Sequence, residues 1–145
     1  MIMSNAVYYE HKVQYYETDQ MGVAHHSNYI RWFEEARICF FDNCGLGYKE
    51  SEKAGLISPV LSVEAQYKNM SYFQDVVVVK VTLTEYKGVR FALQYEITDK
   101  ETGELRCTGK TTHCFIDPNG KVVALKKVSP ERYEIFMRLL EENNG

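Results

Sequence analysis

Residues 19–28 bring together residue types that can do chemistry on a carbonyl group. Asp19 offers a carboxylate, which can attack a carbonyl carbon or activate a water molecule. Gly22 lets the backbone turn tightly and approach a bound ligand closely. The segment ends where an apolar helix starts, and helix starts offer unpaired N–H groups and a partial positive charge that can polarise a carbonyl oxygen. The sequence therefore predicts a site that combines a carboxylate with the beginning of a helix.

Two regular elements flank this segment. Before it, residues 7–15 alternate between apolar or aromatic and polar types, which is the period of a half-buried strand. After it, Ser27 or Asn28 can cap a helix that Gly45 or Gly47 ends. The large apolar side chains of this helix recur at helical spacing, and they are Tyr29, Ile30, Trp32, Phe33, Ala36, Phe40 and Phe41. They cover more than one stripe, so we expect a central helix that other structure mostly encloses.

The second half of the chain predicts four further strands, at residues 56–67, 76–86, 89–99 and 105–116. Lys87-Gly88 predicts a tight hairpin, and residues 99–104 and 117–120 predict two more turns, so the strands should form an antiparallel meander. Ser129-Pro130-Glu131 is a typical helix start and predicts a short C-terminal helix. The expected fold class is α+β, with an antiparallel sheet wrapped around a long central helix. This is the hot-dog arrangement.

Length and composition fit a single domain that spans residues 1–145. The chain has 145 residues, of which 45% are hydrophobic, and it can bury a substantial core. The formal charge is -3 and both signs are interspersed, so the sequence shows no basic patch that would bind nucleic acid and no lysine cluster that would bind a membrane surface. We see neither a secretory signal nor a membrane span, and therefore expect no membrane insertion and a cytoplasmic location.

The cysteines predict neither a metal site nor a disulfide framework. Cys39, Cys44, Cys107 and Cys114 lack the close paired spacing of a zinc or redox centre. In a reducing compartment they are expected to be small buried hydrophobic residues.

The predicted topology also indicates a homo-oligomer. The sheet covers only one side of the central helix, so the other side and the sheet edge need cover. A self-paired dimer supplies both, and a dimer or a tetramer built as a dimer of dimers is expected.

The chain resembles the hot-dog acyl-CoA thioesterases of the 4-hydroxybenzoyl-CoA thioesterase family, and within it the bacterial branch typified by the Tol-Pal-associated enzymes. The resemblance spans roughly residues 7–116, and its specific signature lies within residues 15–37. The motifs that carry it are Tyr15-Tyr16-Glu17-Thr18-Asp19, Gly22-Val23, His26-Ser27-Asn28-Tyr29 and Glu34-Glu35-Ala36-Arg37. It implies hydrolysis of a coenzyme A thioester without a cofactor or a metal.

The resemblance also implies roles for individual residues. The catalytic aspartate of the family falls on Asp19, as nucleophile or general base, and Tyr15 and His26 fall on its neighbouring tyrosine and histidine. The backbone N–H that binds the thioester oxygen falls at His26. We prefer His26 to His25 because the histidine of the family lies seven residues after the aspartate and three before the tyrosine, here Tyr29.

Basic residues are expected at the entrance, because coenzyme A carries phosphates. Lys68, Lys87 and Arg90 are the candidates, and the last two flank the hairpin that resembles the phosphate-contacting segment of the family. A solvated turn explains Lys87 and Arg90 equally well. For Tyr15, in a strand of alternating aromatic residues, core packing is the expected role, and a hydroxyl close to the Asp19 carboxylate is the alternative.

Two alternative functions stay open. A hot-dog dehydratase or hydratase would use a histidine as acid and base, and the pair His25 and His26 makes this conceivable. A non-catalytic module that binds acyl thioesters would need only the pocket. Trp32, Phe33, Phe73 and Phe91 could line that pocket or belong to the core.

Overall fold

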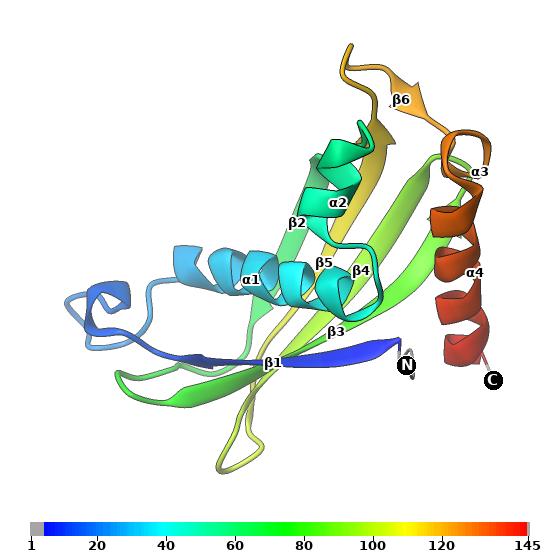
Figure 1. Ribbon diagram of the computed structural model, residues 1–145. Helices are drawn as coiled ribbons and strands as arrows, with labels where there is room; N and C mark the ends of the chain where they lie inside the picture. Colours follow the sequence, from blue (N-terminus) through cyan, green and yellow to red (C-terminus); the bar gives the residue numbers. More distant parts are fainter. Residues whose placement is uncertain (1–4, 145) are drawn as a thin grey trace.

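The computed structural model describes residues 5–144, and in them an antiparallel sheet curves around one long helix (Figure 1). The strands are β1 (Ala6–Lys12), β2 (Val60–Tyr67), β3 (Val76–Lys87), β4 (Arg90–Asp99), β5 (Leu105–Ile116) and β6 (Val122–Val123). Their order is β1-β3-β4-β5-β2, and β6 pairs with β5. The helices are α1 (Ser27–Asn43), α2 (Tyr48–Lys53), α3 (Leu125–Val128) and α4 (Pro130–Asn144). The predicted hot-dog arrangement is confirmed.

The core lies between the sheet and one face of α1. Alternate residues of β3, Val77, Val79, Val81 and Leu83, are fully buried, as the period of two in a half-buried strand requires. The α1 residues Trp32, Phe33, Ala36 and Phe40 are also fully buried. Ile30 and Ile38 on the same helix remain about 40% exposed. One side of α1 is therefore uncovered in the single chain, as expected.

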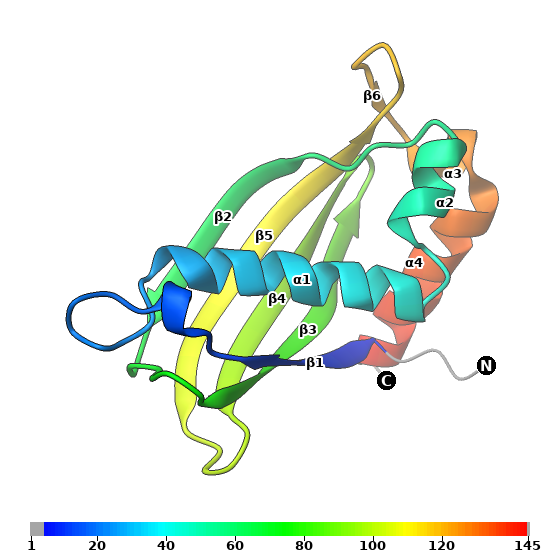
Figure 2. The same cartoon turned by 60° about the vertical axis from the view of Figure 1, so that its left-hand side comes forward.

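The shorter helices and the segment between β1 and α1 lie at opposite ends of the sheet. Figures 1 and 2 show α2, α3 and α4 gathered at the end where β3 turns into β4. Both views place the loop that precedes α1 at the other end. At the end where β3 turns into β4, Phe136 and Leu139 of α4 are fully buried and complete the core. None of the helices within residues 5–144 is long and apolar enough to cross a membrane.

The predicted turns are present. Lys87 pairs with Arg90 across a two-residue loop, and Gly88 has a φ of +62°, which glycine adopts without strain. The looser hairpin is closed by the Asp99 N–H, which donates to the Glu104 carbonyl at 2.9 Å. The C-terminal helix begins at Pro130, as predicted.

The first strand is shorter than predicted. It ends at Lys12, and Tyr15–Glu17 forms a turn of 3-10 helix in place of the strand expected over residues 7–15. The cause is a reciprocal pair of hydrogen bonds. The Gln14 N–H donates to the Glu17 carboxylate at 2.8 Å, and the Glu17 N–H donates to the Gln14 carbonyl at 3.0 Å. This turn redirects the chain toward α1.

Two other expectations were wrong in detail. Neither Ser27 nor Asn28 caps α1: the N-cap position is His26, and the Asn28 side chain donates to backbone carbonyls instead. The strand expected over residues 56–67 begins only at Val60, directly after Pro59, which has no N–H to offer a ladder.

Three short elements were not predicted. They are α2, α3 and β6, each six residues or fewer. Elements of this length carry too few residues for a periodic pattern to emerge.

Candidate active site

Asp19 lies in a tight loop that its own side chain stabilises. Its Oδ1 accepts a hydrogen bond from the Met21 N–H at 2.8 Å, and its carbonyl accepts one from Gly22 at 2.9 Å. The Asp19 N–H donates to the Val23 carbonyl at 3.0 Å, and Gly22 has a φ of +77° that a side chain would strain. The carboxylate is exposed, and its Oδ2 has no hydrogen-bond partner within residues 5–144. One oxygen therefore fixes the loop and the other is available.

The start of α1 offers a free N–H at His26. The His25 N–H donates to the Glu17 carbonyl at 2.8 Å, and the Ser27 N–H donates to His25 Nδ1 at 3.2 Å. The His26 N–H between them has no acceptor among the residues that the structure describes. An unpaired N–H at the positive end of a 17-residue helix can bind a carbonyl oxygen or an oxyanion.

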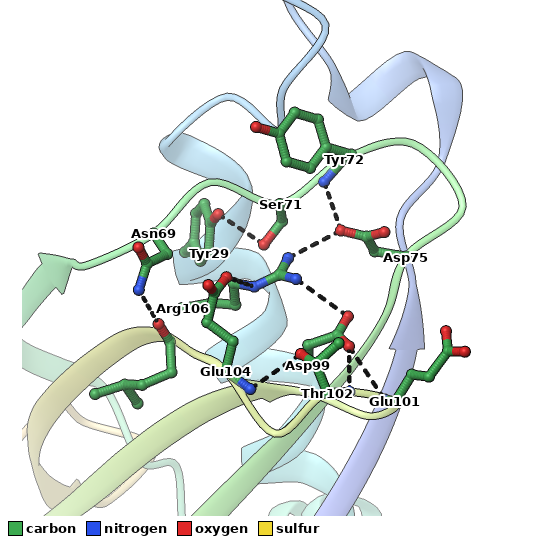
Figure 3. A network of polar contacts seen from close by, with 11 residues as sticks. Tyr29, Asn69, Ser71, Tyr72, Asp75, Asp99, Glu101, Thr102, Glu104 and Arg106 are labelled. Carbon is green, nitrogen blue, oxygen red and sulfur yellow. Dashed lines mark hydrogen bonds and ion pairs between the residues drawn. The ribbon is translucent and has the colours of Figure 1, made fainter.

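The segment from Lys68 to Asp75 packs against this loop (Figure 3). The Ala24 N–H donates to the Ser71 carbonyl at 2.8 Å, and Val23 forms a β-bridge with Tyr72. The Tyr29 hydroxyl of α1 donates to the buried Ser71 hydroxyl at 3.0 Å. Burial raises the pKa of Tyr29, so this phenol stays a neutral donor. The loop and the helix start are thus held against one common support.

Arg106 anchors that support. Its guanidinium contacts Asp75 at 2.9 Å, Asp99 at 3.2 Å and Glu104 at 2.9 Å, and its side chain is only 8% exposed (Figure 3). The Arg106 carbonyl accepts hydrogen bonds from the N–H groups of Lys68 and Asn69. Arg106 therefore joins the β4–β5 hairpin to the segment that supports the loop.

A groove of about 240 Å³ opens beside the helix start. The residues that line it are Ala24, His26, Tyr29, Tyr67, Lys68, Asn69 and Met70. The Tyr67 hydroxyl at the end of β2 donates to the His26 carbonyl at 3.3 Å. The ring of Tyr67 meets the rings of His26 and Tyr29 edge-on, at 6.0 and 5.3 Å between centroids. The groove thus has aromatic walls and one basic side chain at its rim.

The structure brings some of the predicted site residues together and separates others. Asp19 and Gly22 belong to the loop before α1, His26 lies at the start of that helix and Lys68 directly follows β2; His26 and Lys68 both line the groove. Lys87 ends β3 and Arg90 begins β4, at the opposite end of a 12-residue strand that is roughly 35 Å long at about 3.3 Å per residue. Lys87 pairs there with Glu85 at 3.2 Å. Lys87 and Arg90 therefore do not join Asp19 within one chain.

Tyr15 is neither in a strand nor in the core. It belongs to the 3-10 turn and is 76% exposed, and its ring lies edge-on to Phe73 at 5.5 Å. The expectation of core packing was therefore wrong for Tyr15. Of the four aromatic residues that could line a pocket or the core, Trp32, Phe33 and Phe91 are buried in the core, whereas Phe73 is about half exposed beside Tyr15.

Sequence reasoning missed Glu17, Ser71 and Tyr67 as parts of this region. Glu17 is buried with 5% exposure although its neighbours in the turn are exposed. An acidic residue within the specific motif was the available signal. Ser71 and Tyr67 lie more than 40 residues from Asp19 in sequence, and only the pairing of β2 with β5 brings them here.

The cysteines do not take part in this site. Cys44, Cys107 and Cys114 are buried, and all four cysteines are free thiols. Within residues 5–144 there is no group of three or more His, Cys, Asp or Glu side chains that could hold a metal ion.

Comparison with known proteins agrees with this fold. Residues 13–142 match the Thioesterase-like superfamily. The chain is 32% identical to "Putative acyl-CoA thioesterase YneP" of Bacillus subtilis over 128 residues, which cover 88% of this chain and 92% of the relative. It superposes on a DHNA-CoA thioesterase from Staphylococcus aureus with a TM-score of 0.91 and 35% identity, covering 96% of this chain and 93% of that one. A 1,4-dihydroxy-2-naphthoyl-CoA thioesterase from Synechocystis, at 22% identity and a TM-score of 0.81, covers 94% of this chain and 98% of that one and shares the fold.

Fold and comparisons together define the class of protein as a hot-dog thioester hydrolase, which confirms the expectation from sequence. The chain belongs to the Thioesterase-like superfamily.

Proposed function

We propose that this chain hydrolyses an acyl-CoA thioester to the free acid and coenzyme A. The observation that carries the proposal is the free His26 N–H at the start of α1, in a residue that lines a groove together with Ala24 of the Asp19 loop. In the proposed reaction the thioester oxygen accepts a hydrogen bond from this N–H. The donor strengthens its interaction as negative charge develops on the oxygen, and this lowers the barrier.

Asp19 supplies the attack in this proposal. Its carboxylate either forms an acyl anhydride, which water then cleaves, or removes a proton from the water that attacks the carbonyl carbon. In both routes the coenzyme A thiolate is the leaving group and takes up a proton. The unpaired Oδ2 supports either role, because Oδ1 is already used by the Met21 N–H. Tyr15 and the His26 ring are proposed to contact the acyl group or the carboxylate from either side.

Lys68 is the basic residue best supported as a phosphate contact, because it lines the groove. Its ammonium lies 3.2 Å from the Gln66 side chain, an uncharged partner that leaves its charge available. Lys87 and Arg90 remain proposals for phosphate contact that a neighbouring protomer would have to complete. Replacement of each by alanine, with the KM for the acyl-CoA as readout, tests all three residues separately.

A homo-oligomer is part of this proposal. All but one of the residues of β2, an edge strand, are exposed, and its apolar side chains include Val60, Leu61 and Val63. An exposed apolar edge strand is a template for pairing with another chain. Pairing of two β2 edges would cover it and bring the open sides of two α1 helices under shared cover, in a dimer or in a tetramer of two such dimers.

The test is Asp19→Asn, assayed by release of free thiol from a panel of acyl-CoA, aroyl-CoA and carrier-linked thioesters. We expect kcat to fall by about 100-fold or more, the scale of a lost general base, with the fold unchanged. Asparagine can still accept the Met21 hydrogen bond, so the loop is kept. The matched control is Asp117→Asn, because Asp117 makes the same kind of turn contact, with Asn119 at 2.9 Å, outside the site. Wild-type turnover in Asp19→Asn would reject the assignment.

The same panel separates the alternatives. A dehydratase or hydratase would consume an unsaturated acyl thioester without releasing thiol, and a binding module would bind coenzyme A esters without turnover. His25 gives little support to the first, because its Nδ1 is engaged by Ser27 at the start of α1.

A further inference from the structure

The carboxylate of Glu17 is buried and contacts three different parts of the chain. It accepts hydrogen bonds from His11 Nε2 in β1, from the Gln14 N–H in its own turn, and from the Trp32 indole N–H in α1, each at 2.8 Å. Glu17 is 5% exposed and His11 is 12% exposed. Every donor approaches from a separate element, so the carboxylate fixes their relative positions.

The main chain of Glu17 makes a second set of contacts. Its carbonyl accepts hydrogen bonds from the His25 N–H and from the Asn28 side chain, both at 2.8 Å. Glu17 precedes Asp19 by two residues, and His25 precedes the free N–H of His26 by one. A single residue therefore ties down both ends of the loop that separates the attacking group from the oxygen-binding group.

A carboxylate is a costly choice for this position. Moving a charge out of water costs free energy, which hydrogen bonds of good geometry must offset. An apolar residue of similar volume often gives a protein that is equally stable. What charge-assisted hydrogen bonds add is a defined geometry. His11 extends the arrangement, because its Nδ1 lies 3.3 Å from Glu35 on α1 and its ring packs on Trp32 at 4.9 Å between centroids.

We infer that Glu17 is a positioning residue of the thioesterase site, which sets the separation between the Asp19 carboxylate and the His26 N–H. The inference rests on the proposed function, since it requires these two groups to act together. Reaction rates depend steeply on such geometry, because a misplacement of about 1 Å can cost about 100-fold. The groove lined by Tyr67 and Lys68 does not contact the Glu17 carboxylate, so substrate binding should be largely independent of it.

The first experiment is Glu17→Gln in the full chain, with steady-state hydrolysis of an acyl-CoA that the wild type turns over. We expect kcat to fall by about tenfold or more while KM changes by less than about threefold. Asn5→Ala is the matched control, because Asn5 makes two buried hydrogen bonds to Leu83 at the far end of β3. It should lower the melting temperature but leave kcat unchanged for the folded protein. Equal loss of kcat in both variants would overturn the inference.

A double variant distinguishes positioning from general damage. If Glu17 acts through Asp19, then Glu17→Gln combined with Asp19→Asn should be no slower than Asp19→Asn alone. If the double variant instead loses kcat by the product of the two single losses, the inference is contradicted. If Asp19→Asn by itself retains wild-type turnover, the assignment of Asp19 fails, and the positioning role that acts through it fails as well. If Glu17→Gln retains wild-type turnover while Asp19→Asn loses it, the positioning role fails and the proposed function stands.

Trp32 provides a readout that needs no substrate, because it is the only tryptophan in the chain. Loss of its charged acceptor should shift its fluorescence emission in Glu17→Gln but not in Asn5→Ala. Trp32→Phe serves if Glu17→Gln fails to fold, since it keeps a packed ring and removes one donor. We expect it to lower kcat by about threefold to tenfold with KM unchanged, and an unchanged kcat would count against the inference.

Discussion

The ring of Phe33 on α1 packs directly against the backbone of Gly109 on β5. A Cβ built on Gly109 would overlap two atoms of that ring and lie 2.9 Å from the Glu64 carbonyl. Phe33 cannot easily move away, because it is fully buried and stacks on Tyr95 at 4.4 Å between centroids. The helix therefore approaches the sheet at the one position of β5 that has no side chain.

Gly109→Ala is accordingly expected to destabilise the protein by about 1–3 kcal/mol, the usual cost of overpacking a core. Urea unfolding with far-UV circular dichroism measures the change in free energy. Combination with Phe33→Leu should recover part of the loss, because the two positions share one contact. If Gly109→Ala is as stable as the wild type, Phe33 is not fixed in the way described.

Acid should remove stability that Glu17 contributes. Burial by itself would raise the pKa of Glu17, but the hydrogen bonds from His11, the Gln14 N–H and Trp32 outweigh it and lower the pKa below its ordinary 4.5. Because the folded-state pKa is the lower one, the contribution is complete above pH 4.5 and is lost as the pH falls through the folded-state value. The stability difference between wild type and Glu17→Gln should therefore be larger at pH 7 than at about pH 3. A difference that grows on acidification would refute this.

The buried thiols should resist alkylation in the folded protein. Burial raises the pKa of Cys44 and of Cys107 to about 12, and the thiolate is the reactive form. Iodoacetamide at about pH 8 should leave both unmodified in the native protein, whereas denaturant should expose four reactive thiols. Mass spectrometry of the adducts gives the count and the positions. Rapid native labelling of Cys44 or Cys107 would contradict their burial.

Removal of the Arg106 guanidinium should be far more damaging than removal of a surface charge. Arg106→Met leaves Asp75, Asp99 and Glu104 without their shared cation and should cost about 3–5 kcal/mol, as expected when a buried ion pair loses one partner. Lys100→Met is the comparison, since Lys100 pairs with Glu10 at 2.8 Å on the surface. That change should cost less than about 1 kcal/mol. Similar unfolding curves for the two variants would show that the burial of Arg106 contributes little.

Charge on the β2 edge should disrupt the proposed oligomer. Val63→Lys places an ammonium on an exposed apolar edge and should shift the protein toward the monomer in light scattering coupled to size exclusion. Val122→Lys is the control, because Val122 is equally apolar and 55% exposed but lies on the short β6. An unchanged mass for Val63→Lys would move the interface elsewhere.

Much of the fold could be predicted because its long elements carry strong local patterns. The alternation along β3 and the Lys87-Gly88 turn are both readable without tertiary information, and both are confirmed. The end of β1 was not readable, because it depends on the Glu17 carboxylate meeting the backbone three residues earlier. Helix α2 carried no period long enough to detect.

In the candidate site, too, the local motif could be predicted from the sequence and the tertiary contacts could not. The motif around Asp19 predicted that Asp19 and His26 lie close together, and in the structure a single short loop joins them. Lys87 was assigned by likeness of a hairpin, and only the length of β3 shows how far that hairpin lies from the loop in a single chain. The partners of Glu17 come from β1 and α1, and no spacing in the sequence indicates that His11 and Trp32 meet on one carboxylate.

The hydrogen bond from Tyr67 to the His26 carbonyl connects the exposed edge strand β2 directly to His26, whose N–H is the proposed oxygen-binding group. A partner that pairs with β2 is therefore expected to stabilise the beginning of α1 through Tyr67. Under the proposed pairing, specific activity per milligram should decline as the enzyme is diluted below its dissociation constant, and it should return on concentration.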